Sequence, residues 1–126
     1  MKQKVYLAGG FVGNWVIRVT SKNNNLSWID PKEKEPMGSF QEYVKWDLHH
    51  INQCDILFAY VSKSNRSCIG LAVEVGYAKG LGKTVILVLE PYHESINDRH
   101  LLFLAGTADV VFSDLESGAN YLNTFI

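Results

Sequence analysis

Several features that define other protein classes are missing from this chain of 126 residues. It has only two cysteines, Cys54 and Cys68, which form no dense disulfide framework and lack metal-ligand spacing. No apolar run approaches the roughly 18 residues that a membrane-spanning helix needs. The 12 basic and 13 acidic residues nearly balance, which gives no electrostatic footprint for nucleic-acid polymers or acidic membranes. No signal peptide is visible, because Lys2 and Lys4 are followed at once by a strand pattern, and we expect a cytoplasmic protein.

The length and composition indicate one globular domain. A chain of this length can bury one substantial core, and 47% hydrophobic with 20% charged residues is ordinary for such a domain. Short apolar runs alternate with helical patterns and polar loops. Predicted strands cover residues 4–8, 26–29, 55–61, 84–89 and 110–112. Predicted helices cover residues 14–21, with Asn14 as N-cap, 40–53, a helix within 67–83, 101–104 and 115–121, and the main loops are 30–39 and 91–98.

This alternation predicts an α/β fold with a five-stranded parallel sheet covered by helices on both faces, of flavodoxin or Rossmann type. Right-handed crossovers leave few topologies, and the strand order 2-1-3-4-5 is the commonest that fits. Ligands of such sheets bind at the carboxyl ends of the strands, where the strand order reverses. We therefore expect the binding crevice between the loops at residues 9–13 and 62–69.

The stretch SCIGLAVEVGYAKGLGK at residues 67–83 is the most informative part of the chain. Its glycines and alanines make a helix rich in small residues, which predicts close backbone approach to the sheet or to a ligand. Glu74 is expected near the start of this helix, where the unpaired amides favour an ionised carboxylate. At the ligand edge, that carboxylate could be a nucleophile or an electrostatic stabiliser. The alternative is a solvated glutamate in the first helical turn.

Two loops offer candidate binding groups. Gly9 and Gly10 open a glycine-rich turn that could cradle a phosphate, although any strand-to-helix turn needs glycine. Phe11 in that turn could stack on a planar base or close the core. A second loop precedes the helix of Glu74 and could bind an anion, or be a solvated polar loop; its residues are Lys63, Ser64, Asn65, Arg66 and Ser67.

Other polar side chains have simpler interpretations. Asp47 could point into the crevice or into water, and Asp55 is expected to cap or turn the chain at the opposite edge of the sheet. His49 and His50 are adjacent, so they face different directions on a helix and receive no role. Cys68 is expected to be a small polar lining residue rather than a reactive thiol.

Three segments together resemble the nucleoside 2-deoxyribosyltransferase family, and they lie in the family's order and spacing. They are VYLAGGF at residues 5–11, WDLHHINQCDILFAYV at 46–61 and GLAVEVGYAKGLGKTVIL at 70–87. The family includes true transferases and relatives that hydrolyse nucleoside 5′-monophosphates at the N-glycosidic bond. The resemblance implies that residues 1–126 form one such domain, which acts on a small-molecule nucleoside or nucleotide, needs no cofactor or metal, and assembles as a homo-oligomer, a dimer or higher.

The resemblance also assigns roles to individual residues. Glu74 matches the nucleophile that attacks the anomeric carbon, and Tyr6 matches the tyrosine that orients it. Asp47 matches the aspartate that contacts the base and supplies its proton. The expected substrate-binding residues are Gly9, Gly10, Phe11, Arg66, Ser67, Cys68 and Gly70.

Two departures from the family pattern bear on the substrate. Transferases tend to carry an aspartate at the position of Cys68, where it binds the sugar 5′-hydroxyl, and the monophosphate hydrolases tend to carry serine. A carboxylate would repel a 5′-phosphate, whereas Cys68 would not. Asp109 and Val110 also replace the asparagine that transferases lend to a neighbouring subunit.

The leading hypothesis is therefore an enzyme that cleaves or transfers an N-glycosidic bond. The alternatives are a non-catalytic nucleotide-binding or sensing module on the same fold, and an NAD-cleaving enzyme similar to TIR domains.

Overall fold

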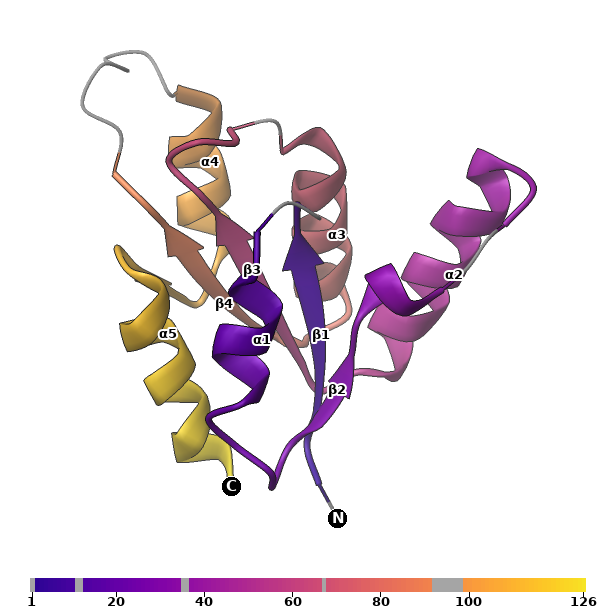
Figure 1. The fold of residues 1–126 in the computed structure, drawn as a ribbon. Coiled ribbons are helices and arrows are strands. Elements are labelled where there is room, and N and C mark those ends of the chain that lie inside the picture. The colour runs from indigo at the N-terminus through magenta and orange to yellow at the C-terminus, as the bar shows by residue number, and fades with distance from the viewer. Residues whose placement is uncertain (1, 11–12, 35–36, 67, 92–98) are drawn as a thin grey trace.

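The fold is a single parallel β-sheet with helices on both faces (Figure 1). The computed structural model describes residues 2–10, 13–34, 37–66, 68–91 and 99–126. Within them the strand order is β2-β1-β3-β4-β5, and all neighbouring pairs are parallel, as the sequence predicts. The strands are β1 (Lys4–Gly9), β2 (Ser27–Ile29), β3 (Ile56–Val61), β4 (Thr84–Leu89) and β5 (Val110–Phe112).

In the described parts of the chain, three helices cover one face of the sheet and two cover the other (Figure 1). The first layer contains α2 (Phe40–Gln53), α3 (Ile69–Gly80) and α4 (Arg99–Thr107), and the second contains α1 (Trp15–Thr20) and α5 (Leu115–Leu122). Short 3-10 turns lie at η1 (Pro31–Glu33) and η2 (Asn123–Phe125). The helix expected at residues 101–104 is longer, and most of the loop expected at 91–98 lies outside the described residues.

Strand side chains alternate between two hydrophobic cores. Tyr6 and Ala8 of β1 enter the core under α2, α3 and α4, whereas Val5 and Leu7 enter the core under α1 and α5. This period of two buries both faces of the central strands, which explains their nearly continuous apolar sequences. The arrangement places Tyr6 on the same side of the sheet as α3, the helix that carries Glu74.

Local polar contacts begin several elements. The carboxylate of Asp55 accepts a hydrogen bond of 2.8 Å from the Lys4 amide, which confirms its expected role at the amino edge of the sheet. Ser39 caps α2 by accepting from the Glu42 amide at 3.3 Å. Asn14 stands at the N-cap position of α1, as the sequence predicts, although its side chain makes no capping hydrogen bond.

The glycines of α3 do not approach the sheet closely, so that alternative of the expectation is wrong, while close approach to a ligand stays a prediction. A Cβ atom built on Gly70, Gly76 or Gly80 would meet nothing within 4 Å. The close approach occurs instead in α5, where a Cβ on Gly118 would lie 2.4 Å from Cγ2 of Val88. The glycines of α3 therefore line open space, and Gly70 alone among them borders a cleft.

The apolar stripe of α2 is only partly covered. Ile51 is fully buried and Leu48 is half-buried, but Phe40 is 85% exposed and Val44 is 52% exposed. The carboxyl end of α2 thus packs against the sheet, while its amino end projects from the body (Figure 1). No helix in the described parts of the chain combines the length and apolarity needed to cross a membrane.

Candidate active site

A cleft of about 690 Å³ lies at the carboxyl ends of β1 and β3, where the strand order reverses. This is the place that the predicted topology indicates. We call it the cleft; its lining residues are Gly9, Gly10, Gly13, Asn14, Trp15, Arg18, Tyr60, Val61, Ser62, Ser64, Asn65, Cys68, Gly70, Leu71 and Glu74. Five of the predicted site residues, Gly9, Gly10, Cys68, Gly70 and Glu74, are therefore among its walls.

Packing explains the two glycines at the carboxyl end of β1, Gly9 within the strand and Gly10 directly after it. A Cβ on Gly9 would lie 2.8 Å from Cζ2 of Trp15, and one on Gly10 would lie 2.7 Å from Nδ2 of Asn65. The Trp15 indole also donates a hydrogen bond of 2.9 Å to the Gly10 carbonyl. These contacts bring the end of β1 against α1 and the loop after β3, and so form one wall of the cleft.

Glu74 and Tyr6 make the central contact of the site. The Tyr6 hydroxyl donates a hydrogen bond of 2.6 Å to Oε2 of Glu74. Tyr6 is fully buried, and its neighbours in the sheet, Ile29 and Leu57, fix its backbone. A rigid strand therefore holds one oxygen of a carboxyl group that lines the cleft.

The environment of Glu74 differs from the sequence-based expectation. Glu74 is the sixth residue of α3 and not part of its first turn. Burial raises the pKa of Glu74 to about 7, with a further increase from the Asp47 charge, while the Tyr6 hydrogen bond and the Lys34 charge lower it. Because Glu74 lies beyond the first turn of α3, the unpaired amides of the helix start are not its partners, and removal from solvent favours the neutral form of its carboxyl group. Burial, followed by the Glu74 charge, also holds the pKa of Tyr6 far above its usual range.

Asp47 joins this pair from α2. It raises the pKa of both Glu74 and Tyr6, through its charge and through hydrogen bonding. Its side chain is 24% exposed, so the carboxylate remains accessible. The structure thus brings together the three residues predicted to be catalytic, Tyr6, Asp47 and Glu74.

Lys34 is a fourth member of this group that the sequence did not predict. Its ammonium forms an ion pair with Oδ1 of Asp47, and its side chain is only 4% exposed. It also lies 5.0 Å from the ring centres of both Tyr43 and Trp46 on α2. No local pattern in a loop of alternating charges marks one lysine as buried, so tertiary packing alone identifies it.

The remaining predicted binding residues differ in position. The Arg66 guanidinium donates through Nη1 to the carbonyls of Glu90 at 2.6 Å and Ser62 at 3.5 Å. Arg66 therefore ties the loop after β3 to the end of β4, and it is not among the lining residues of the cleft. Phe11 and Ser67 lie outside the described residues.

Arg18 and Tyr60 line the cleft but were missed from the sequence. Arg18 stands one helical turn after Asn14, which also lines the cleft, so helical spacing was the available signal. Burial and the neighbouring Glu90 raise the pKa of Tyr60 to about 12, and the positive charge of Arg18 opposes this. Arg18 and Glu74 are the charged groups among the described lining residues.

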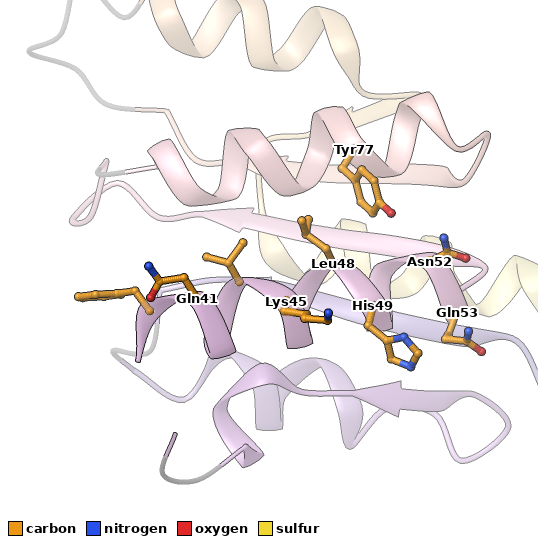
Figure 2. A pocket seen from close by; sticks show the side chains of 9 residues that line it. Gln41, Lys45, Leu48, His49, Asn52, Gln53 and Tyr77 are labelled. Atoms are coloured by element: carbon orange, nitrogen blue, oxygen red, sulfur yellow. The ribbon is translucent and has the colours of Figure 1, made fainter. Parts of the chain in front are cut away.

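A second concavity, which we call the α2 groove, has a volume of about 800 Å³ (Figure 2). Figure 2 shows Leu48 directed from α2 toward Tyr77 of α3, with Lys45, His49 and Gln53 along the same helix. Phe40 and Val44 complete its apolar lining. The α2 groove contains none of the predicted site residues.

The fold and the site define a doubly wound α/β domain with a tyrosine-bound carboxyl group at the edge where such domains bind ligands. Residues 2–92 match the family described as "Nucleoside 2-deoxyribosyltransferase like". The chain therefore belongs to the nucleoside 2-deoxyribosyltransferase-like family. This family includes enzymes of N-glycosidic bonds and binds nucleoside or nucleotide substrates.

Solved structures share the fold at low sequence identity. A conserved protein from Enterococcus faecalis V583 superposes with a TM-score of 0.80 at 16% identity, with 100% of both chains covered. The CMP N-glycosidase BcmB from Clostridium botulinum superposes with a TM-score of 0.59 at 18% identity, covering 96% of this chain and 99% of that one. No curated protein is similar enough in sequence to count as a match. At these identities the superpositions establish the fold alone.

Proposed function

We propose that this protein cleaves the N-glycosidic bond of a nucleoside 5′-monophosphate, with Glu74 as the nucleophile at the anomeric carbon. The observation that carries the proposal is the hydrogen bond of 2.6 Å between the Tyr6 hydroxyl and Glu74, at a carboxyl group that lines the cleft. Membership of the family and the fold shared with a CMP N-glycosidase support it.

The residues suit the chemistry of this bond. A glycosidic bond breaks through an oxocarbenium-like state, which a carboxylate stabilises or traps as an ester. The Tyr6 hydrogen bond fixes the orientation of the Glu74 carboxylate. A pKa of about 7 provides a substantial fraction of carboxylate at neutral pH while keeping that carboxylate more basic than an exposed glutamate.

Asp47 is proposed to handle the proton of the leaving base. The base departs with the electron pair of the broken bond and takes a proton that the Asp47 carboxylate passes on from solvent water, while the Glu74 oxygen bonds to the anomeric carbon. Water then attacks that carbon, displaces Glu74 as the carboxylate and releases a proton to solvent through Asp47. A free base in place of water would give transfer instead of hydrolysis.

The charges around the cleft support a phosphorylated substrate. Glu74 is the one carboxylate among its described lining residues, and Cys68 stands where a second carboxylate would repel a phosphate. Arg18 supplies a guanidinium at the cleft, which is a favourable partner for phosphate oxygens. Arg66 does not line the cleft, but its hydrogen bonds hold the loop after β3, which forms part of the cleft wall.

A substrate panel tests this function. Nucleosides, nucleoside 5′-monophosphates and NAD would be incubated with the protein, with and without an acceptor base, and free base measured by chromatography. We expect release from monophosphates, and Arg18→Gln should reduce their preference over nucleosides by about tenfold. Lys22→Gln, which removes the same charge after the carboxyl end of α1, is the matched control.

Each other outcome selects a different function. Equal rates for nucleosides and monophosphates would remove the phosphate requirement, and base exchange without hydrolysis would indicate a transferase. Base release from NAD alone would favour the NAD-cleaving alternative. Ligand binding without any base release would favour a nucleotide-sensing module.

A further inference from the structure

Lys34 occupies an unusual position for a lysine. It follows η1, and its ammonium forms an ion pair with Asp47 while lying 5.0 Å from the centres of two aromatic rings. Those rings, Tyr43 and Trp46, come from the same helix as Asp47. Lysine is almost never so buried unless it is paired. The aromatic faces and the carboxylate together fix the position of the positive charge.

The positive charge of Lys34 affects how the carboxyl group of Glu74 ionises beside Asp47. Two carboxylates that share a small site resist ionising together, yet the proposed reaction needs Glu74 in its charged form. The described groups that act on Glu74 are the Tyr6 hydroxyl from β1, Asp47 from α2 and Lys34 from the segment after η1. Among these described groups, Lys34 is the cation.

We propose that Lys34 is a positioning residue of this active site, whose ammonium holds the Asp47 carboxylate and offsets its charge so that Glu74 ionises beside it. This inference rests on the proposed function, since it names a further residue for the same reaction. Lys34 holds Asp47 through the ion pair, and its positive charge also favours the Glu74 carboxylate, without contact with the substrate in this account.

The first test is the pH dependence of kcat/KM for base release in Lys34→Met. Without the ammonium, the like charges oppose each other, so the acidic limb of the profile should move up by about one pH unit. The rate at pH 6 should then fall about tenfold more than the rate at pH 9. Lys34→Arg keeps the charge and should hold the limb within a few tenths of a unit of wild type. Lys32→Met, at an exposed lysine two residues earlier, should leave the whole profile unchanged.

The outcome separates a positioning role from a structural one. A folded Lys34→Met whose rate falls equally at all pH values, with an unmoved limb, would overturn the proposal. So would a Lys34→Arg variant with a limb that moves as far as that of Lys34→Met.

A second test compares Asp47→Asn with the double variant Lys34→Met/Asp47→Asn. Neither protein leaves the Asp47 carboxylate buried without its partner, because both lack that carboxylate. Because the ammonium then has no Asp47 charge to offset, Lys34→Met should move the limb less in this background than in the wild type, and only its direct attraction for Glu74 remains. A shift as large as that in the wild-type background would overturn the proposal. This comparison still tests the double variant against Asp47→Asn if Lys34→Met alone does not fold.

A third measurement needs no substrate and so separates failure of this inference from failure of the proposed function. The carboxyl carbon of Glu74 would be titrated by NMR in wild type, Lys34→Met and Lys34→Met/Asp47→Asn. We expect the midpoint to rise in the single variant and to return toward wild type in the double variant. An unchanged midpoint in a folded Lys34→Met would overturn the electrostatic role, whatever the enzyme assays give.

Discussion

Glu74 experiences two opposing influences on one carboxyl group. Removal from water favours its neutral form, while the Tyr6 hydrogen bond and the positive charge of Lys34 favour the carboxylate. Burial dominates, so the pKa rises from 4.5 to about 7. A group tuned in this way suits catalysis near neutral pH, and it also makes the stability of the fold depend on pH.

We expect Glu74→Gln to remove part of that pH dependence. In the wild type the folded state keeps the Glu74 proton between pH 4.5 and about 7 while the unfolded state loses it. The free energy of unfolding should therefore fall as pH rises through this window, by up to about 3 kcal/mol. Urea unfolding at pH 5 and pH 8 measures the difference, which should shrink in the variant. An unchanged difference would show that Glu74 is not the group responsible.

Asp47→Asn should slow base release most strongly for substrates with poor leaving bases, because such bases depend on the transferred proton. The loss should reach about a hundredfold for a poor leaving base and remain small for an activated one. Rates for a series of substituted bases give this dependence. The substitution would leave the Lys34 charge without its partner, so thermal unfolding must first establish that the variant folds. Equal losses across the series would reduce Asp47 to a residue that only positions the ligand.

The sequence predicted some of these residues and not others for clear physical reasons. Tyr6, Asp47 and Glu74 stand in motifs whose spacing identifies the family, and the structure brings them together. Lys34 contacts Asp47 across 13 residues of chain, a pairing that only the tertiary structure determines. Arg66 was predicted from its place before a helix, but its hydrogen bonds to the loop depend on how β3 and β4 end.

At the level of elements, the strands were easier to predict than the contacts that each helix makes with its neighbours. Continuous apolar runs such as residues 84–89 require burial on both sides, which a parallel sheet provides. Helical spacing predicted α2 correctly, but no pattern shows which part of an apolar stripe will be covered. Small residues in α3 suggested close packing, whereas the close contact lies at Gly118 in α5.

Two glycine substitutions test how closely α5 and α3 are packed. Gly118→Ala should destabilise the fold by about 1–3 kcal/mol, because its Cβ would lie 2.4 Å from the Val88 side chain. Gly76→Ala should instead stabilise it by about 0.5–1 kcal/mol, since the added methyl group meets nothing and alanine favours a helix interior. Chemical denaturation of both variants checks the signs. A destabilised Gly76→Ala would mean that α3 is more closely packed than described.

At the scale of the whole molecule, α2 and α3 expose several large apolar side chains. Exposed large side chains include Phe40 and Val44 on α2, and Ile69 and Val73 on α3. These two helices pack side by side and carry Asp47 and Glu74, so a partner seated here would border the site. We propose that the partner is a second copy of the chain, which would cover this surface around a twofold axis.

Sedimentation velocity at micromolar concentration tests this assembly. We expect a dimer or a larger oligomer, and Val44→Lys should shift it toward monomer because a charge would enter the apolar contact. Leu102→Lys, at a residue of α4 with 70% exposure, is the matched control and should leave the assembly intact. A wild-type protein that sediments as a monomer would contradict the proposal.

The central claim is that Glu74 attacks the anomeric carbon of a nucleotide. Its most direct test compares base release from nucleoside 5′-monophosphates by wild type and Glu74→Gln, after circular dichroism has shown that both proteins fold. The account predicts release by the wild type and a loss of roughly a thousandfold or more in the variant, because an amide cannot form the ester. A folded Glu74→Gln that releases base at the wild-type rate would contradict the account.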